Sequence, residues 1–488
     1  MSPHRYSLLW ATVAALAIGI FTAACLAWHA RRQSNTPLTV SYWYWQIPFH
    51  LRPNEIAELK EMGVHRLFVR AATFEPDGVG GIRLSLPQSF KSNASDLQVS
   101  LVFNFHYGLV RQFERMPNSQ LVLAVLRGVQ REKEAARSAR VSVKGIQLDL
   151  DCPTRLLPKY AQFLAELAPA IHRQKMELSV TALPTWYTSR VVQSVAAAVD
   201  FMAPQFYEAQ IPKTRDRLVT IANLRLMRRG MQAADRIGRP FYVGIPAYGH
   251  ALVYGYTGKL IGLYHDMGVG EALRCPSFHF VRAYTAARGE SEEEMVELVT
   301  DEAAQPDPSA ALSANEGLPE VGPYHIVYDL PTPEVIAQYI AELRRAHLTN
   351  CRGVILFRFP EPGDEETVPL SSVAAVLHGE RPRPVLTAKT SISSVPWQAI
   401  EAVDRQSIAG VDRSLELRLT NIGTGVGFAG PGALTVTLHF DRPGVEETGM
   451  GMFDSVAGFC QAGSSDSGQA LPASIGRANL LIYHGQSL

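Results

Sequence analysis

Hydrophobic and polar positions alternate with two different periods between residues 38 and 359. Short apolar runs whose side chains alternate between two faces predict strands, and longer segments with apolar residues three or four positions apart predict amphipathic helices. The predicted strands cover residues 38–46, 65–71, 97–105, 143–151, 177–183, 201–206, 241–246 and 353–359. The predicted helices cover residues 54–62, 119–139, 156–175, 190–198, 218–237 and 334–347.

Strands and helices therefore alternate about eight times along this part of the chain. This order is typical of an α/β fold of the (β/α)8 TIM barrel type. The stretch 251–331 is too long for a loop of such a barrel. We expect it to be an insertion between the seventh and eighth strands, with a small structure of its own and disordered patches such as 303–316.

One predicted strand carries a row of polar residues. From Ile146 onward the residues alternate, so that Gln147, Asp149 and Asp151 share one face. Residues on the same face of a strand lie roughly 6.6 to 6.8 Å apart, so the two carboxylates can address neighbouring atoms of one small ligand. A charged row at the end of an apolar strand costs stability unless the charges are solvated, paired or used. The alternative interpretation is that the two aspartates cap the following helix.

Composition narrows the classes of function. The chain has 46 basic and 46 acidic residues, so its charge gives no reason to expect a nucleic acid partner. It contains no glycine-rich phosphate loop and no Cys or His cluster at metal-ligand spacing, so we expect no cofactor and no bound metal. Cys152 and Cys351 fall at opposite ends of a predicted parallel sheet, and we expect no disulfide framework.

The first 36 residues precede the predicted fold. The apolar run from Leu8 to Trp28 is long enough to cross a bilayer, for which about 20 residues suffice. It predicts an exported protein that is periplasmic or anchored to the membrane of a bacterial envelope. Residues 22–25 (Thr-Ala-Ala-Cys) are similar to a lipoprotein cleavage box, with Cys25 as the lipidated residue. A cleaved signal peptide, a lipid anchor and an uncleaved single span are the three alternatives.

The pattern changes again after the predicted barrel domain, residues 37–380. Residues 381–384 (Arg-Pro-Arg-Pro) are typical of a linker. Beyond them, residues 415–419 and 434–438 alternate between apolar and polar positions and are separated by glycine-rich turns. This pattern predicts a β-rich accessory domain over residues 381–488, such as a small sandwich.

Aromatic and polar residues follow many of the predicted strands, at the end of the barrel where active sites form. Aromatic side chains around a few acids and amides suit a sugar, because its C–H face stacks on rings while its hydroxyls need polar partners. We therefore expect a glycan or oligosaccharide partner. The candidate site residues are Trp43, Trp45, Asn104, His106, Gln147, Asp149, Asp151, Trp186, Gln205, Tyr207, Glu208, Tyr248, His250, Arg358 and Glu361.

Each candidate also has a structural alternative. Trp43 and Trp45 suit barrel packing as well as ligand contact. His106 and His250 suit ordinary loop histidines. Arg358 suits an ion pair with one of the aspartates, because a buried acid row needs a cation.

Several of these motifs resemble glycoside hydrolase family 18, the chitinase-like barrels. Residues 145–151 (Gly-Ile-Gln-Leu-Asp-Leu-Asp) resemble the strand-four signature of that family, and residues 202–208 resemble the sixth-strand segment with its catalytic-site tyrosine. Residues 244–249 resemble its seventh strand, and Tyr328-Asp329 with residues 353–357 resemble its closing run. The chain is also similar to an uncharacterised bacterial domain family of unknown function with such a barrel.

The resemblance implies hydrolysis of N-acetylhexosamine-containing glycans, with attack by the acetamido oxygen of the substrate itself. Carried over, Asp151 takes the place of the general acid, Asp149 orients the acetamido group and Tyr207 bonds to it. Asp151 stands where the family has Glu, which moves its proton by about 1 to 1.5 Å, and such a displacement can cost about 100-fold in rate. Gln147 and Leu150 also depart from the family pattern.

Three classes of function follow. A hydrolase is favoured by the retained Asp149 and Tyr207, with Glu208 as a second acid if Asp151 acts as nucleophile or orienting base. The pKa of one acid in the pair should rise, since like charges repel. A catalytically inactive carbohydrate-binding barrel is favoured by Asp at position 151. An envelope structural protein that uses the C-terminal β-rich domain is the third class.

Overall fold

The computed structural model describes most of the chain. The described residues are 38–91, 96–208, 212–217, 220–264, 268–275, 277–288, 290–301, 322–330, 332–361, 364–394, 413–425, 427–428, 434–439, 455–461, 471–478 and 481–482. The N-terminal segment 1–36, with Cys25, lies outside them. No helix in the described part of the chain is both long and apolar enough to span a bilayer.

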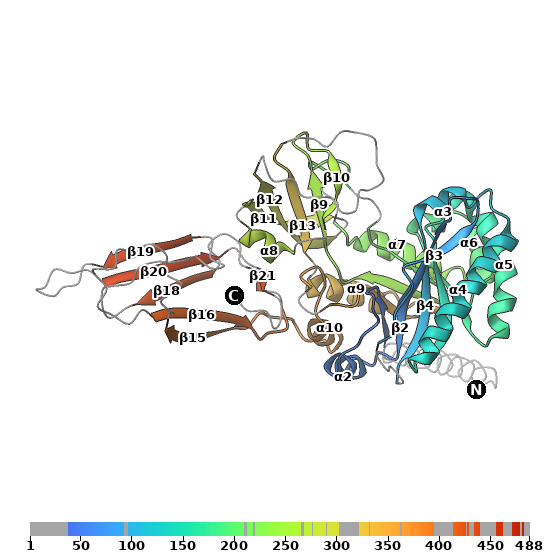
Figure 1. The fold of residues 1–488 in the computed structure, drawn as a ribbon, viewed down its shortest axis with the longest axis horizontal. Coiled ribbons are helices and arrows are strands. Elements are labelled where there is room, and N and C mark those ends of the chain that lie inside the picture. Colours follow the sequence, from blue (N-terminus) through green and yellow to red (C-terminus); the bar gives the residue numbers. More distant parts are fainter. Residues whose placement is uncertain are drawn as a thin grey trace, which may run out of the picture.

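Eight parallel strands close into a barrel, because β1 pairs with both β14 and β2. The strands follow one another around the barrel in the order β1, β14, β8, β7, β6, β5, β4, β2. The predicted (β/α)8 barrel is thus confirmed (Figure 1). The barrel strands are β1 (Thr39–Tyr44), β2 (Arg66–Pro76), β4 (Gln98–Phe105), β5 (Ser142–Asp149), β6 (Glu177–Ala182), β7 (Phe201–Pro204), β8 (Phe241–Pro246) and β14 (Cys351–Phe357).

The strands divide their side chains between two cores, as alternation along a strand requires. Inside the barrel, aromatic and β-branched residues such as Trp43, Phe68 and Ile355 pack together. Outside it, the strands pack against one apolar face of each helix. The helices are α2 (Pro53–Glu61), α3 (Tyr107–Gln112), α4 (Asn118–Ser138), α5 (Leu157–Arg173), α6 (Val192–Ala197), α7 (Leu224–Asp235), α9 (Pro333–Arg345) and α10 (Leu370–Leu377).

Two parts of the prediction need correction. The helix predicted over residues 218–237 begins only at Leu224, because the Asn223 side chain accepts a hydrogen bond from the Leu226 N–H and caps the helix there. The pattern also did not reveal α3, α10 or β3 (Ile82–Ser85), which pairs with the end of β2. These elements are short, and short elements carry little periodicity.

The insertion between β8 and α9 folds as an antiparallel sheet beside the barrel (Figure 1). Its strand order is β10, β9, β13, β12, β11, and α8 (Val269–Arg274) packs against β11. The predicted insertion therefore has its own structure, while residues 303–316 lie outside the described residues. The strands are β9 (His250–Tyr254), β10 (Leu260–Tyr264), β11 (Phe278–Arg288), β12 (Ser291–Thr300) and β13 (His325–Leu330).

The C-terminal part of the chain is β-rich, as predicted, and contains the two expected alternating segments within β16 and β18. Its described strands pair as β15 with β16, β17 with β21, and β18 and β19 on either side of β20. These strands are β15 (Leu386–Ser394), β16 (Arg413–Asn421), β17 (Gly427–Phe428), β18 (Leu434–His439), β19 (Ser455–Gln461), β20 (Leu471–Ala478) and β21 (Leu481–Ile482).

Candidate active site

A cavity of about 490 Å³, including the space open to solvent, lies at the C-terminal ends of the barrel strands. Three carboxyl groups, four amide or hydroxyl groups and five aromatic rings, two of which carry the hydroxyls of tyrosines, contribute to its wall. Eight of the residues predicted from the sequence meet here, although they come from four separate regions of the chain. The lining residues are Trp43, Trp45, Asp149, Asp151, Thr181, Gln205, Tyr207, Glu208, Tyr248 and Phe357.

The two aspartates occupy different positions from those predicted. Strand β5 ends at Asp149, and the chain then turns tightly, with the Cys152 N–H 2.6 Å from the Leu150 carbonyl oxygen. The polar row of the strand therefore consists only of Gln147 and Asp149. Asp151 lies beyond the strand and is exposed toward solvent at the mouth of the cavity. The pair thus combines an inner carboxyl with an outer one.

The inner carboxyl has specific partners. The Thr181 hydroxyl donates a hydrogen bond of 2.7 Å to Asp149 Oδ1, and the Arg70 guanidinium lies near enough to favour the charged form of Asp149. Burial and the neighbouring Asp151 outweigh both effects and raise the pKa of Asp149 to about 7. Although Asp151 keeps part of its surface exposed, the protein atoms that surround the rest of it reduce its solvation and raise its pKa as well. The pair therefore holds a proton near neutral pH, when an isolated aspartate is ionised.

The segment after β7 brings two further groups into the cavity. Tyr207 is only 6% exposed, and its hydroxyl has no hydrogen-bond partner among the described residues. Burial, with Glu208 and the aspartates nearby, raises the pKa of Tyr207 well above its usual value, so the hydroxyl keeps its proton. Glu208 has a left-handed backbone with φ of 46°, which is uncommon for a residue with a side chain.

Glu208 has partners between β8 and β9 and at the start of β9. The Tyr248 hydroxyl donates a hydrogen bond to Glu208 Oε2. His250 Nδ1 lies 3.9 Å from Glu208 Oε1. The strained backbone is thus accompanied by specific contacts of the side chain, an association that is common at functional sites.

The floor of the cavity is a packed layer rather than a binding surface. Trp43 is buried, and its indole Nε1 donates a hydrogen bond of 2.6 Å to Gln147 Oε1. Gln147 is also fully buried, so it holds Trp43 from inside the barrel and does not line the cavity. Gly244 permits this packing, because a Cβ there would lie 3.2 Å from both Trp43 and Tyr207.

Three other predicted contacts are not made. Trp186 is fully buried, and its Nε1 donates to the Cys152 carbonyl oxygen, so it stabilises the turn after β5. Asn104 lies beside Asp149 in the sheet register but outside the cavity lining. Arg358 pairs with Asp364 and Glu366 at 3.0 and 3.1 Å rather than with the aspartates.

Neither candidate histidine lines the cavity, and His106 has a structural role. His106 accepts a hydrogen bond from the Gly108 N–H at the start of α3. His250 is buried beside Glu208 but does not line the cavity. Glu361 is exposed and follows the buried or partly buried residues 358–360 after β14.

Sequence reasoning missed three residues of the site: Thr181, Phe357 and Arg70. Thr181 alternates with Ser179 along an otherwise apolar strand, which is the same signal that revealed Asp149. Arg70 likewise interrupts an apolar stretch, whereas Phe357 carries no such signal. Arg70 also lies over the Trp45 ring, with its guanidinium carbon 5.7 Å from the ring centroid.

This arrangement suits acid–base chemistry on an uncharged polar ligand with apolar faces. It offers a carboxyl pair with a retained proton, a buried hydroxyl and rings on which a sugar can stack. Among the described residues, no three His, Cys, Asp or Glu side chains are grouped to hold a metal ion. The described thiols of Cys152, Cys275 and Cys351 are free.

Residues 111–262 match the family described as "Domain of unknown function (DUF3142)". No curated protein sequence matches the chain. Solved structures with a similar fold include the spore cortex-lytic enzyme SleL of Bacillus megaterium QM B1551, with 11% identity, coverage of 70% of this chain and 73% of SleL, and a TM-score of 0.44.

Two further solved structures are similar over the same share of this chain. A chitinase from Chromobacterium violaceum ATCC 12472 has 14% identity, 70% coverage of this chain and 98% of its own, and a TM-score of 0.43. A glycoside hydrolase family 18 N-acetylglucosaminidase from Paenibacillus barengoltzii has 12% identity, 70% and 99% coverage, and a TM-score of 0.44. The barrel itself is established by its strand order.

Proposed function

We propose that this protein is an exported glycoside hydrolase that acts on N-acetylhexosamine-containing glycans. The main support is the grouping of Asp149, Asp151 and Tyr207 in one aromatic-walled cavity, because these are the residues that the family resemblance assigns to catalysis. The apolar run from Leu8 to Trp28 supports export to the bacterial envelope, by a cleaved signal, a lipid anchor at Cys25 or an uncleaved span.

In the proposed reaction, the sugar stacks on the aromatic wall with its acetamido group directed to the inner carboxyl. Asp149, held by Thr181, accepts a hydrogen bond from the acetamido N–H, and the Tyr207 hydroxyl donates one to the acetamido oxygen. That oxygen attacks the anomeric carbon as the glycosidic C–O bond breaks. Asp151 gives its proton to the leaving oxygen and then takes a proton from the water that opens the cyclic intermediate.

A second candidate function is carbohydrate binding without hydrolysis. The observation that favours it is the side chain at position 151, because Asp is one methylene shorter than the Glu of the resembling family. A displaced proton slows the reaction but leaves stacking and hydrogen bonding intact. The two functions therefore differ in turnover and agree in ligand binding.

Turnover of N-acetylglucosamine oligomers and peptidoglycan fragments by purified residues 37–488 tests the proposal. We expect product release that falls at least about 100-fold in Asp151→Asn and Asp149→Asn, because the first removes the proton donor and the second removes the carboxylate that orients the acetamido group. The matched control is Asp96→Asn, since Asp96 is exposed and pairs with Lys60 far from the cavity.

Saturable binding without product in the wild-type protein would contradict hydrolysis. If Trp45→Ala then weakened that binding while Asp151→Asn did not, the protein would be a sugar-binding barrel. Absence of binding to every oligosaccharide tested would contradict both functions.

A further inference from the structure

A second pair of carboxyl groups lies outside the cavity, between the insertion and the barrel. Glu293 on β12 and Asp329 on β13 are 4% and 3% exposed, and they lie close enough for the charge of Asp329 to raise the pKa of Glu293. Two buried carboxylates so close together repel one another unless one of them carries a proton. Glu293 Oε2 receives no hydrogen bond from the described residues, which is consistent with a proton on that atom.

These side chains hold the chain that leads into α7. Glu293 Oε1 accepts a hydrogen bond of 2.7 Å from the Ala222 N–H, and Asp329 Oδ2 accepts one of 3.0 Å from the Ile221 N–H. Ser291, on the same face of β12, accepts a third from the Leu224 N–H at 2.9 Å. The backbone of residues 221–224 is therefore fixed by side chains of the insertion.

The same backbone supports the candidate active site from its other side. The Glu208 N–H donates a hydrogen bond of 2.8 Å to the Ile221 carbonyl oxygen, and Tyr207 forms a β-bridge with Ala222. The carboxyl pair and the two cavity residues thus contact the same short segment. A shift of this segment must move Tyr207 and Glu208.

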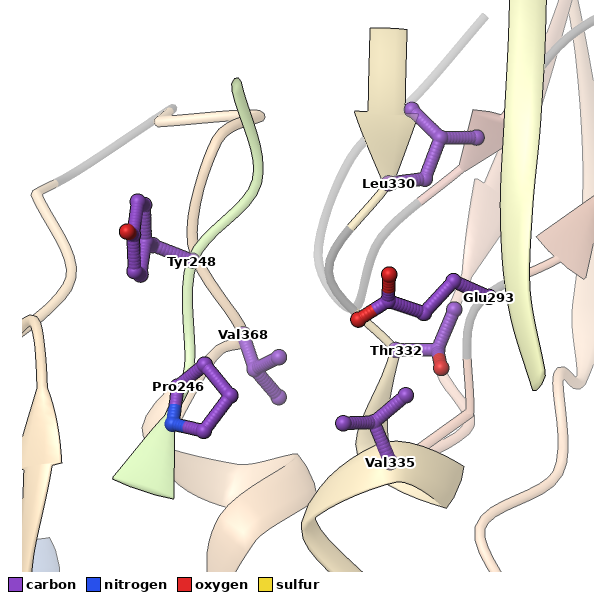
Figure 2. A pocket seen from close by; sticks show the side chains of 7 residues that line it. All are labelled: Pro246, Tyr248, Glu293, Leu330, Thr332, Val335 and Val368. Atoms are coloured by element: carbon purple, nitrogen blue, oxygen red, sulfur yellow. The ribbon is translucent and has the colours of Figure 1, made fainter. Parts of the chain in front are cut away.

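A small cavity lies between Glu293 and the end of β8 (Figure 2). It has about 210 Å³ of empty space, including space open to solvent, and Glu293 and Tyr248 are among its lining residues. Figure 2 shows the Glu293 carboxyl directed into this space, with Pro246 and Tyr248 across from it. Tyr248 also lines the larger cavity and bonds to Glu208, so the two carboxyl sites share a wall.

The groups around the pair favour its protonated state. Burial raises the pKa of Glu293 well above its usual value and that of Asp329 to about 7, and the Glu208 carboxylate adds to the latter. The other titratable groups that face the pair are His250, opposite Asp329 in the sheet register, and the hydroxyls of Tyr248, Tyr284 and Tyr339.

We propose that Glu293 and Asp329 share one proton and act together as positioning residues for Tyr207 and Glu208. Loss of this proton places two like charges in a buried site and separates them. The separation loosens the hydrogen bonds to residues 221–222 and with them the wall of the candidate active site. The insertion therefore helps to position Tyr207 and Glu208 in the candidate active site, and alkaline pH removes this effect.

Hydrogen exchange of the whole purified chain tests the positioning without any substrate. In wild type we expect the protection of the Ile221, Ala222 and Glu208 amides, corrected for intrinsic rates, to fall about ten-fold or more between pH 7 and pH 10, because the pair becomes doubly charged only when Glu293, whose pKa is raised well above its usual value, loses its proton. Glu293→Gln keeps the acceptor for Ala222 and always donates to Asp329, so its protection should not change with pH. Glu293→Ala should lack protection at both pH values.

The matched control is Glu294→Gln, because Glu294 is the next residue on β12 and faces the other side of the sheet. It should retain the pH dependence of wild type. Equal pH dependence in wild type and Glu293→Gln would overturn the proposal, as would protection in wild type that is constant with pH.

A second test measures catalysis and rests on the proposed hydrolysis, whereas the exchange experiment needs no substrate. The alkaline fall of kcat in wild type should move to higher pH in Glu293→Gln, with KM at pH 6 unchanged. If no substrate is turned over, the proposed function fails while the exchange experiment still decides the role of the pair. If turnover occurs with identical pH profiles in the two proteins, the coupling fails while the proposed function stands.

Discussion

At the scale of single residues, the inner carboxyl of the cavity depends on one neutral hydrogen-bond donor. The Thr181 hydroxyl lies 2.7 Å from Asp149 Oδ1 and favours the ionised form, against burial and Asp151, which favour the protonated form. A hydrogen bond to a charged group contributes about 1.5 to 3 kcal/mol, and one pKa unit corresponds to about 1.4 kcal/mol. Thr181 therefore determines where near neutral pH the aspartate pair releases its shared proton.

Replacement of Thr181 by the isosteric valine should raise the pKa of Asp149 by about one unit or more above its value of about 7. The raised value means that the protonated pair persists to higher pH, so the alkaline limb of the activity profile should move upward. NMR titration of the side-chain carboxyl carbons measures the same shift without substrate. Thr185→Val is the control, because Thr185 is exposed on the neighbouring loop. A downward shift in Thr181→Val would contradict this account of the pair.

The residues of the site could be predicted from the sequence where a polar side chain interrupts an apolar strand. Asp149 is predicted in this way, and Thr181 carries the same signal. Tyr207 follows a predicted strand, and its role is predicted from the family resemblance of residues 202–208. The direction of a large aromatic residue after a strand could not be predicted. Trp45 lines the cavity whereas Trp186 is fully buried, and the difference arises from the turn that places the Cys152 carbonyl next to the Trp186 indole.

At the scale of elements, α7 fixes the end of β7 through a close approach between two residues. Gly230 faces the Phe206 ring so closely that a Cβ at position 230 would overlap it. Phe206 directly precedes Tyr207, and its carbonyl accepts a hydrogen bond from the Tyr339 hydroxyl at 3.2 Å. The packing of α7 therefore affects the position of Tyr207 in the cavity through the Phe206 ring.

The substitution Gly230→Ala should destabilise the protein by about 1 to 3 kcal/mol, because overpacking displaces a ring that has no free space around it. This cost exceeds the roughly 0.5 to 1 kcal/mol that alanine gains over glycine in a helix. Urea denaturation measures the change, and ligand affinity should fall with it because Tyr207 moves. Arg229→Ala is the control, since Arg229 is exposed on the same helix. Unchanged or increased stability in Gly230→Ala would show that Phe206 has an alternative position.

The existence of most long elements could be predicted because their periodicity extends over several turns or pleats. Their ends could not, because the decisive contacts are tertiary. Residues 220–223 continue the apolar pattern of α7, yet the insertion side chains bind the backbone N–H groups there and hold it outside the helix. Glu293 itself lies in a run of three glutamates, a pattern typical of a solvated strand face, and its burial has no sequence signal.

At the scale of the whole molecule, the barrel closes without any contribution from the C-terminal sheets. Strand β1 bonds to β14 and β2, and the last helix of the barrel domain, α10, packs against α2 and α9. Leu370, Val373 and Val376 form the buried face of α10. The insertion, in contrast, supplies side chains that bind barrel backbone. The two additions to the barrel should therefore differ in their effect on the candidate active site.

Removal of residues 381–488 should leave the stability and the activity of the barrel close to those of the longer chain, because the barrel strands and α10 are retained. A chain that ends at residue 369 should not fold. Burial of each large apolar side chain contributes about 1.5 to 3 kcal/mol, so the loss of three of them removes roughly 5 to 9 kcal/mol from a total of about 5 to 15 kcal/mol. Thermal unfolding and oligosaccharide turnover of chains 37–380 and 37–369 measure both effects. A 37–380 chain that is folded but inactive would instead assign the C-terminal sheets a direct part in the site.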